Sequence, residues 1–116
     1  MRAPHGGAFA PAALAGVDQL KDRESSGEAA YRIAEILHGV GDEEAALDMY
    51  LTAANVTGDA PAAARALIGA LRSLVTIGNR PAAEALYHRL LDSSATDPAL
   101  LAEARTMLRS PRAQRD

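Results

Sequence analysis

Two ten-residue segments of this chain are similar to each other, and this repeat constrains the fold more than any other feature. GDEEAALDMY occupies residues 41–50, and GNRPAAEALY occupies residues 78–87, which is 37 residues later. The matched positions are Gly41 and Gly78, Ala45-Ala46 and Ala82-Ala83, and Tyr50 and Tyr87. A period of about 20–50 residues indicates that the chain is built from similar units that stack on one another.

The composition and the pattern of apolar residues favour helices. Alanine, the best helix former, makes up about a quarter of the 116 residues, and aromatic residues make up 3%. Apolar residues recur at helical spacing between glycine, proline and serine breaks. The pattern predicts six helices, over residues 10–23, 27–39, 42–56, 60–77, 80–93 and 98–109. Residues 1–9 and 110–116 lack it, and we expect a flexible N-terminal tail and a polar C-terminal tail.

Capping residues set the predicted helix starts. Ser25 stands three residues before Glu28, a capping-box pattern that predicts a helix start near residue 27. Asp42, Asp59 and Asn79 precede later helices as N-cap residues. The predicted helices are separated by only a few residues, and connections of about 2–5 residues make neighbouring helices antiparallel hairpins.

The two repeated segments belong to a longer pattern of large and small residues. The first unit carries Ala30, Ile33-Ala34, Leu37, Gly41-Asp42, Ala46, Tyr50 and Ala53, and the second carries Leu67, Ala70-Leu71, Leu74, Gly78-Asn79, Ala83, Tyr87 and Leu90. This pattern resembles the tetratricopeptide repeat family over about residues 27–109. The period is 37 residues instead of the family's 34 or so, and Ala34 and Leu71 stand where the family has glycine.

The resemblance implies a specific all-α architecture. Antiparallel helical hairpins would stack as a short right-handed solenoid, with two units plus flanking helices, and residues 10–109 would form a single tetratricopeptide-like domain. Ala46 and Ala83 are expected where paired helices cross most closely, and Tyr50 and Tyr87 are expected to be buried between helices. The alternative is a generic alanine-rich helical bundle.

The sequence contains none of the common catalytic motifs. It has no P-loop, no Rossmann glycine pattern, no nucleophile elbow and no zinc-protease histidine pair. Glu84, His88 and Asp92 follow one another at i, i+4 and i+8, a spacing that could hold a divalent metal on one helix face. We favour a solvated face with pairwise charge contacts. We therefore expect no catalytic residue, no metal site and no cofactor.

The distribution of charge and apolar residues bears on partners and location. Residues 1–60 carry 4 − 10 = −6 charges and residues 61–116 carry 8 − 5 = +3. Nucleic-acid binding by the basic C-terminal region (Arg105, Arg109, Arg112 and Arg115) is not favoured, since the overall charge is negative and aromatic residues are few. We expect no membrane span, because no apolar run approaches about 18 residues. With no signal segment and no cysteine, we expect a cytoplasmic protein, and the alanine- and arginine-rich composition suggests a bacterial one.

The resemblance also implies where a partner would bind. The first helices of successive hairpins line a concave groove in this architecture. The partner-binding positions predicted for that groove are Glu28, Tyr31, Glu35, His38, Arg65, Ile68, Arg72, Val75, Arg105 and Arg109. The groove would be acidic at one end and basic at the other. The lysine and asparagine residues with which the family clamps a C-terminal carboxylate are missing, so the resemblance does not imply that specificity.

We therefore expect a non-enzymatic protein–protein interaction module, an adaptor or assembly factor that binds a protein or peptide segment in the groove. Two alternatives stay open. One is a small enzyme or enzyme accessory that uses the groove as a substrate pocket, with Glu35, His38 and Arg72 as its polar groups. The other is a self-assembling scaffold, a homo-oligomer in which acidic and basic halves join head to tail.

Overall fold

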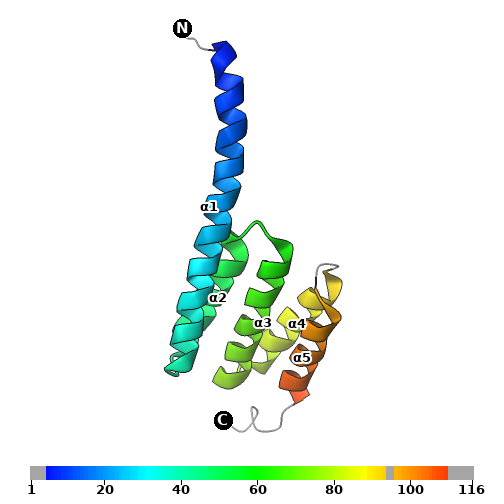
Figure 1. The fold of residues 1–116 in the computed structure, drawn as a ribbon. Helices are drawn as coiled ribbons and strands as arrows, with labels where there is room; N and C mark the ends of the chain where they lie inside the picture. The colour runs from blue at the N-terminus through cyan, green and yellow to red at the C-terminus, as the bar shows by residue number, and fades with distance from the viewer. Residues whose placement is uncertain (1–4, 94–95, 110–116) are drawn as a thin grey trace.

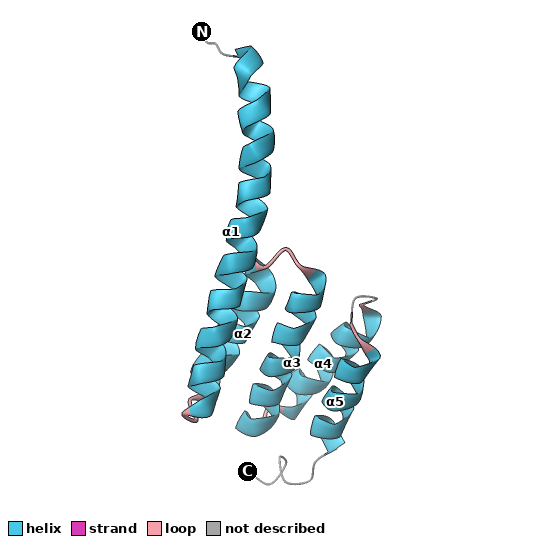
Figure 2. Cartoon of the chain, in the orientation of Figure 1, coloured by secondary structure: helices cyan, strands magenta, loops and turns pink. Residues whose placement is uncertain are grey.

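The structure of this protein is a computed structural model that describes residues 5–93 and 96–109, with side chains from residue 21 onward. Within those residues the chain forms five helices and no strand (Figure 1; Figure 2). They are α1 (His5–Gly39), α2 (Glu43–Val56), α3 (Ala60–Ile77), α4 (Arg80–Asp92) and α5 (Pro98–Arg109). Each helix runs antiparallel to the one before it (Figure 1). The prediction of an all-helical protein is confirmed for this part of the chain.

The last four predicted helices agree with the structure to within one residue at each end. The side chains of Asp42, Asp59 and Asn79 accept hydrogen bonds from backbone N–H groups three residues ahead, at 3.3, 2.9 and 3.3 Å. Gly78 ends α3 with a φ of 98°, in the left-handed region that favours glycine. The start and stop signals of these helices were therefore read correctly from the sequence.

The predicted break near residue 25 is wrong, because α1 runs without interruption from His5 to Gly39. Gly27 packs against the end of α2, where an added Cβ would lie 2.7 Å from Thr57 Cβ. Arg23 Nε donates to the carbonyl of Val56 at 3.3 Å, and Glu28 binds Arg32 at 3.3 Å instead of capping a helix. Contacts with α2 therefore hold the helix together across the predicted break. The backbone of residues 5–9, predicted as part of a tail, is helical, and residues 110–116 lie outside the described residues.

The core is centred on α3, which contacts α1, α2, α4 and α5. Ala46, Tyr50 and Ala83 are fully buried, as predicted, whereas Tyr87 is only half-buried. Gly69 makes room for Tyr50, since a Cβ there would lie 2.4 Å from the Tyr50 Cε1 atom. α3 is long and apolar enough to cross a membrane by composition alone, but 56% of it is buried among the other helices, as expected of a core helix.

The apolar residues of α1 divide between two faces. Ala30 and Ala34 are buried against the rest of the molecule, but Ile33, which belongs to the same repeat pattern, is 46% exposed. Ile33 lies about 60° around the helix from Ala30 and about 100° from Ala34, so its side chain points away from the packed face. The N-terminal half of α1 extends past the other helices (Figure 1).

Candidate functional site

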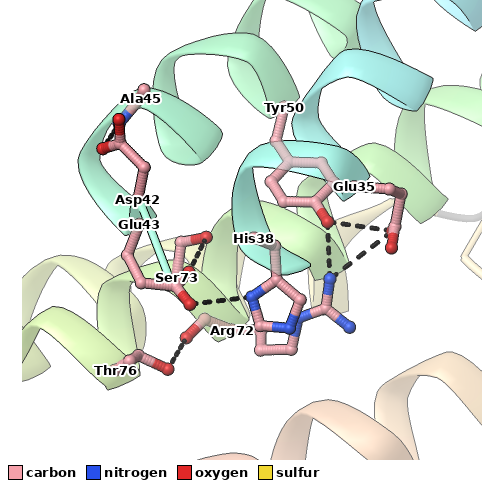
Figure 3. A network of polar contacts seen from close by, with 9 residues as sticks. All are labelled: Glu35, His38, Asp42, Glu43, Ala45, Tyr50, Arg72, Ser73 and Thr76. Carbon is pink, nitrogen blue, oxygen red and sulfur yellow. Dashed lines mark hydrogen bonds and ion pairs between the residues drawn. The ribbon is translucent and has the colours of Figure 1, made fainter. Parts of the chain in front are cut away.

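A cluster of three polar side chains joins α1, α2 and α3 (Figure 3). The Tyr50 hydroxyl donates to Glu35 Oε2 at 2.9 Å and accepts from Arg72 Nη2 at 2.5 Å. The same Arg72 nitrogen lies 3.4 Å from Glu35 Oε2. The Tyr50 side chain is buried, while those of Glu35 and Arg72 remain about a third exposed, at 40% and 32%. Glu35 and Arg72 therefore present partly exposed charges that a buried tyrosine holds in place.

The surroundings of this cluster shift the pKa values of its members. Burial, and then the hydrogen bond to Glu35, raises the pKa of Tyr50 well above its ordinary value. Burial alone would raise the pKa of Glu35, but hydrogen bonds from Tyr50 and Tyr31 and the charge of Arg72 outweigh it and lower that pKa. Burial and the hydrogen bond to Glu35 raise the pKa of Tyr31. At neutral pH, Glu35 is thus an ionised acceptor and both tyrosines are protonated donors, an arrangement suited to binding and positioning.

Two arginines of α3 stack on two tyrosines. The ring centroids of Tyr31 and Tyr50 lie 5.7 Å apart in an edge-to-face arrangement. The Arg65 guanidinium lies 5.9 Å from the Tyr31 centroid, and that of Arg72 lies 5.7 Å from the Tyr50 centroid. Cation–π contacts of this kind stabilise by about 0.5–1 kcal/mol at exposed sites. Arg65 and Arg72 therefore both face α1, on the side predicted for the groove.

A second polar cluster fixes the turn between α1 and α2 (Figure 3). Glu43 Oε2 lies 2.8 Å from His38 Nδ1, and Glu43 Oε1 accepts from Ser73 Oγ at 2.9 Å. Ser73 is fully buried. Neither Ser73 nor its contact with Glu43 was predicted from the sequence. The available signal was a serine between Leu71 and Leu74, inside the apolar run of a core helix, because a buried hydroxyl needs a partner.

A cleft of about 230 Å³ opens between α1, the end of α2 and the start of α3. Its charged side chains are three carboxylates and one guanidinium, which gives 1 − 3 = −2 formal charges. Tyr31 contributes the aromatic wall. The lining residues are Glu24, Gly27, Glu28, Tyr31, Ala53, Thr57, Asp59, Ala62 and Arg65. The cleft therefore combines an aromatic ring with an acidic rim.

The structure brings six of the ten predicted groove residues to the side where α1 faces α3. Three line the cleft, two belong to the Tyr50 cluster and one belongs to the turn cluster: Glu28, Tyr31, Arg65, Glu35, Arg72 and His38. Ile68 and Val75 were predicted to be exposed, and this is wrong, since they are 5% and 7% exposed. Both belong to the core, because α3 is packed by helices on several sides. Arg105 and Arg109 are exposed on α5, which packs on α3 and α4, so they lie apart from the Tyr50 cluster.

No three histidine, aspartate or glutamate side chains gather closely enough to hold a metal ion in the part of the chain that the structure describes. On α4, Glu84 lies 3.6 Å from Arg80, and the His88 ring lies beside Tyr87 with centroids 6.0 Å apart. The two residues thus take part in pairwise surface contacts.

Searches with family models, curated proteins and solved structures find no match to this chain.

Proposed function

We propose that this chain is a tetratricopeptide-like interaction module, an adaptor or assembly factor that binds a protein segment along the side where α1 faces α3. The main support for this proposal is the set of side chains that lie on that side of the molecule. It gathers partly exposed charges, two tyrosines and an open cleft, in a molecule whose remaining inter-helix contacts are mostly apolar. Clefts lined by aromatic and polar groups are common binding sites.

The ion pair between Glu35 and Arg72 supports the repeat-like arrangement within this proposal. These two residues are 37 positions apart, which equals the offset between the repeated segments. They are therefore equivalent positions in consecutive units, and they lie side by side. Such pairing is expected when equivalent helices of successive hairpins stack in the same direction.

The charges on this side favour one kind of segment. Glu24, Glu28 and Asp59 surround the cleft, and Arg65 stacks on its tyrosine. A segment that presents a lysine or arginine at this end would meet opposite charge, and opposite charge steers association and fixes register. Glu35 and Arg72 lie farther along the same side and would contact the rest of the segment.

An array of short peptides, graded by net charge and probed with the full chain, tests this proposal. We expect basic peptides to bind, and Glu24→Gln together with Glu28→Gln to weaken that binding by about tenfold, which corresponds to about 1.4 kcal/mol. The matched control is Glu103→Gln on α5, an exposed carboxylate outside the cleft. Binding should also weaken as salt rises. If the Glu24/Glu28 variant and the Glu103 variant bind the array equally well, the proposed surface is wrong.

A further inference from the structure

The outer side of α1 carries a stripe of exposed apolar side chains. Ile33, Ile36 and Val40 are 46%, 66% and 74% exposed. Ala29 is also exposed and continues the line toward the N-terminus. The four positions are spaced by four, three and four residues. We call Ala29, Ile33, Ile36 and Val40 the α1 stripe. A contiguous patch of exposed apolar side chains is typical of a surface that another molecule covers.

The spacing of the stripe indicates what can cover it. Positions spaced four, three and four residues apart form the seam along which one helix packs its side chains into another. Arg32 lies at the edge of the stripe and pairs with Glu28 of the same helix at 3.3 Å, so a charged side chain borders the seam. The surface therefore fits a helix with an apolar stripe of its own, and α1 of a second copy has that stripe.

We propose that two copies of this chain associate through the α1 stripe, with the two α1 helices antiparallel. In this register Ile33 lies opposite Ile36 of the second copy, and Val40 lies opposite Ala29. A large side chain then meets a small one at each end of the contact. A parallel arrangement would instead place the two acidic turns, which carry Asp42, Glu43 and Glu44, beside each other, and like charges repel.

The size of the stripe limits the strength of this contact. The stripe covers about three turns of helix, or roughly 17 Å. A stable protein interface buries about 800 Å² on each partner, and four side chains along one helix provide less than that. The dimer is therefore weak and depends on concentration.

The α1 stripe and the proposed partner-binding side can be occupied at the same time. Ile33 and Glu35 are two residues apart, which places them about 200° apart around the helix. The two surfaces thus lie on different faces of α1, and the dimer is independent of the proposed function.

Sedimentation velocity of the full chain, from about 1 µM to about 1 mM, tests the association. We expect the mass to rise from monomer to dimer, and Ile36→Glu to increase the dimer dissociation constant by at least about tenfold, because a charge would enter both sides of the seam. The matched control is Leu91→Glu on α4, since Leu91 is 46% exposed, like Ile33, but lies outside the stripe. A monomer throughout the range, or equal losses in the two variants, would overturn the proposal.

Disulfide trapping tests the register, because the natural chain has no cysteine. A mixture of Ile33→Cys and Ile36→Cys chains should form mixed dimers faster than either variant alone, since a disulfide needs Cβ atoms about 4 Å apart. Faster trapping within each variant alone would overturn the antiparallel register. Circular dichroism of every variant should match that of the natural chain, since these side chains are exposed.

Discussion

Tyr50 and Tyr87 hold the same position in the two repeated segments, but their surroundings differ. Tyr50 is fully buried, because Gly69 on α3 leaves space for its ring, and its hydroxyl binds Glu35 and Arg72. Tyr87 is half-buried. The residue 37 positions after Gly69 is Thr106, which is exposed on the shorter helix α5. A repeated segment thus specifies its own helix, and the helix that follows decides how deeply the tyrosine is buried.

The largest expected difference between the two units comes from truncating the tyrosines. Tyr50→Ala should lower the free energy of unfolding by about 3–5 kcal/mol, since it removes a fully buried ring. Tyr87→Ala should cost clearly less, because part of that ring already contacts water. Urea denaturation monitored by circular dichroism measures both. Equal losses would mean that the exposure of Tyr87 has no energetic consequence.

Closing the space beside Tyr50 should have the next largest effect. Gly69→Ala should destabilise the chain by about 1–3 kcal/mol, because the added methyl overlaps the Tyr50 ring. Gly39→Ala is the matched control, since nothing lies within 4 Å of a Cβ there and alanine favours helix by up to about 1 kcal/mol. The two substitutions should therefore shift the melting temperature in opposite directions. An increase in the melting temperature of Gly69→Ala would show that the Tyr50 ring moves aside freely.

The Glu35 carboxylate should make the first unit sensitive to acid. Its pKa is lowered in the folded chain, so its stabilising contribution is present above its unfolded pKa, near 4.5, and is lost as pH falls through the folded value. The stability difference between the natural chain and Glu35→Gln should therefore be largest near pH 7 and narrow below about pH 4. Denaturant titrations across this range measure it. A difference independent of pH would remove Glu35 from the cluster's energetics.

The smallest expected effect concerns the exposed cation–π contact. Arg65→Met keeps the apolar stem of the side chain and removes the charge above Tyr31, and it should cost about 0.5–1 kcal/mol. Arg72→Met should cost more, because Arg72 also donates to the Tyr50 hydroxyl. Equal costs, measured by denaturation, would mean that the hydrogen bond adds nothing to the stacking.

The sequence predicted those parts of the fold that depend on neighbouring residues. The caps at Asp42, Asp59 and Asn79 and the buried alanines at 46 and 83 are local or repeated signals, and they are confirmed. The parts that it missed depend on distant residues. Ser25 and Glu28 resemble a capping box, but Thr57, at the end of α2, packs on Gly27, and the helix continues.

The candidate site shows the same limit. The repeat pattern assigned Tyr31, Glu35, Arg65 and Arg72 to one groove, and in the structure Arg65 stacks on Tyr31 while Arg72 pairs with Glu35. The same prediction wrongly placed Ile68 on the exposed side. Helical spacing does not show how many helices pack around α3. Ser73 on α3 contacts Glu43 on α2, whereas all the predicted groove residues lie on α1, α3 and α5. Only the three-dimensional arrangement shows this contact.

The uninterrupted course of α1 has a mechanical consequence. The helix is anchored to α2 as far as Arg23, whose side chain reaches the carbonyl of Val56. The 18 residues from His5 to Asp22 continue for about 27 Å beyond that anchor. A rod of this length amplifies small rotations, so that a tilt of about 10° at the hairpin moves its far end by about 5 Å. Any change in packing between α1 and α3 would thus be read out as a displacement at the distant end of the helix.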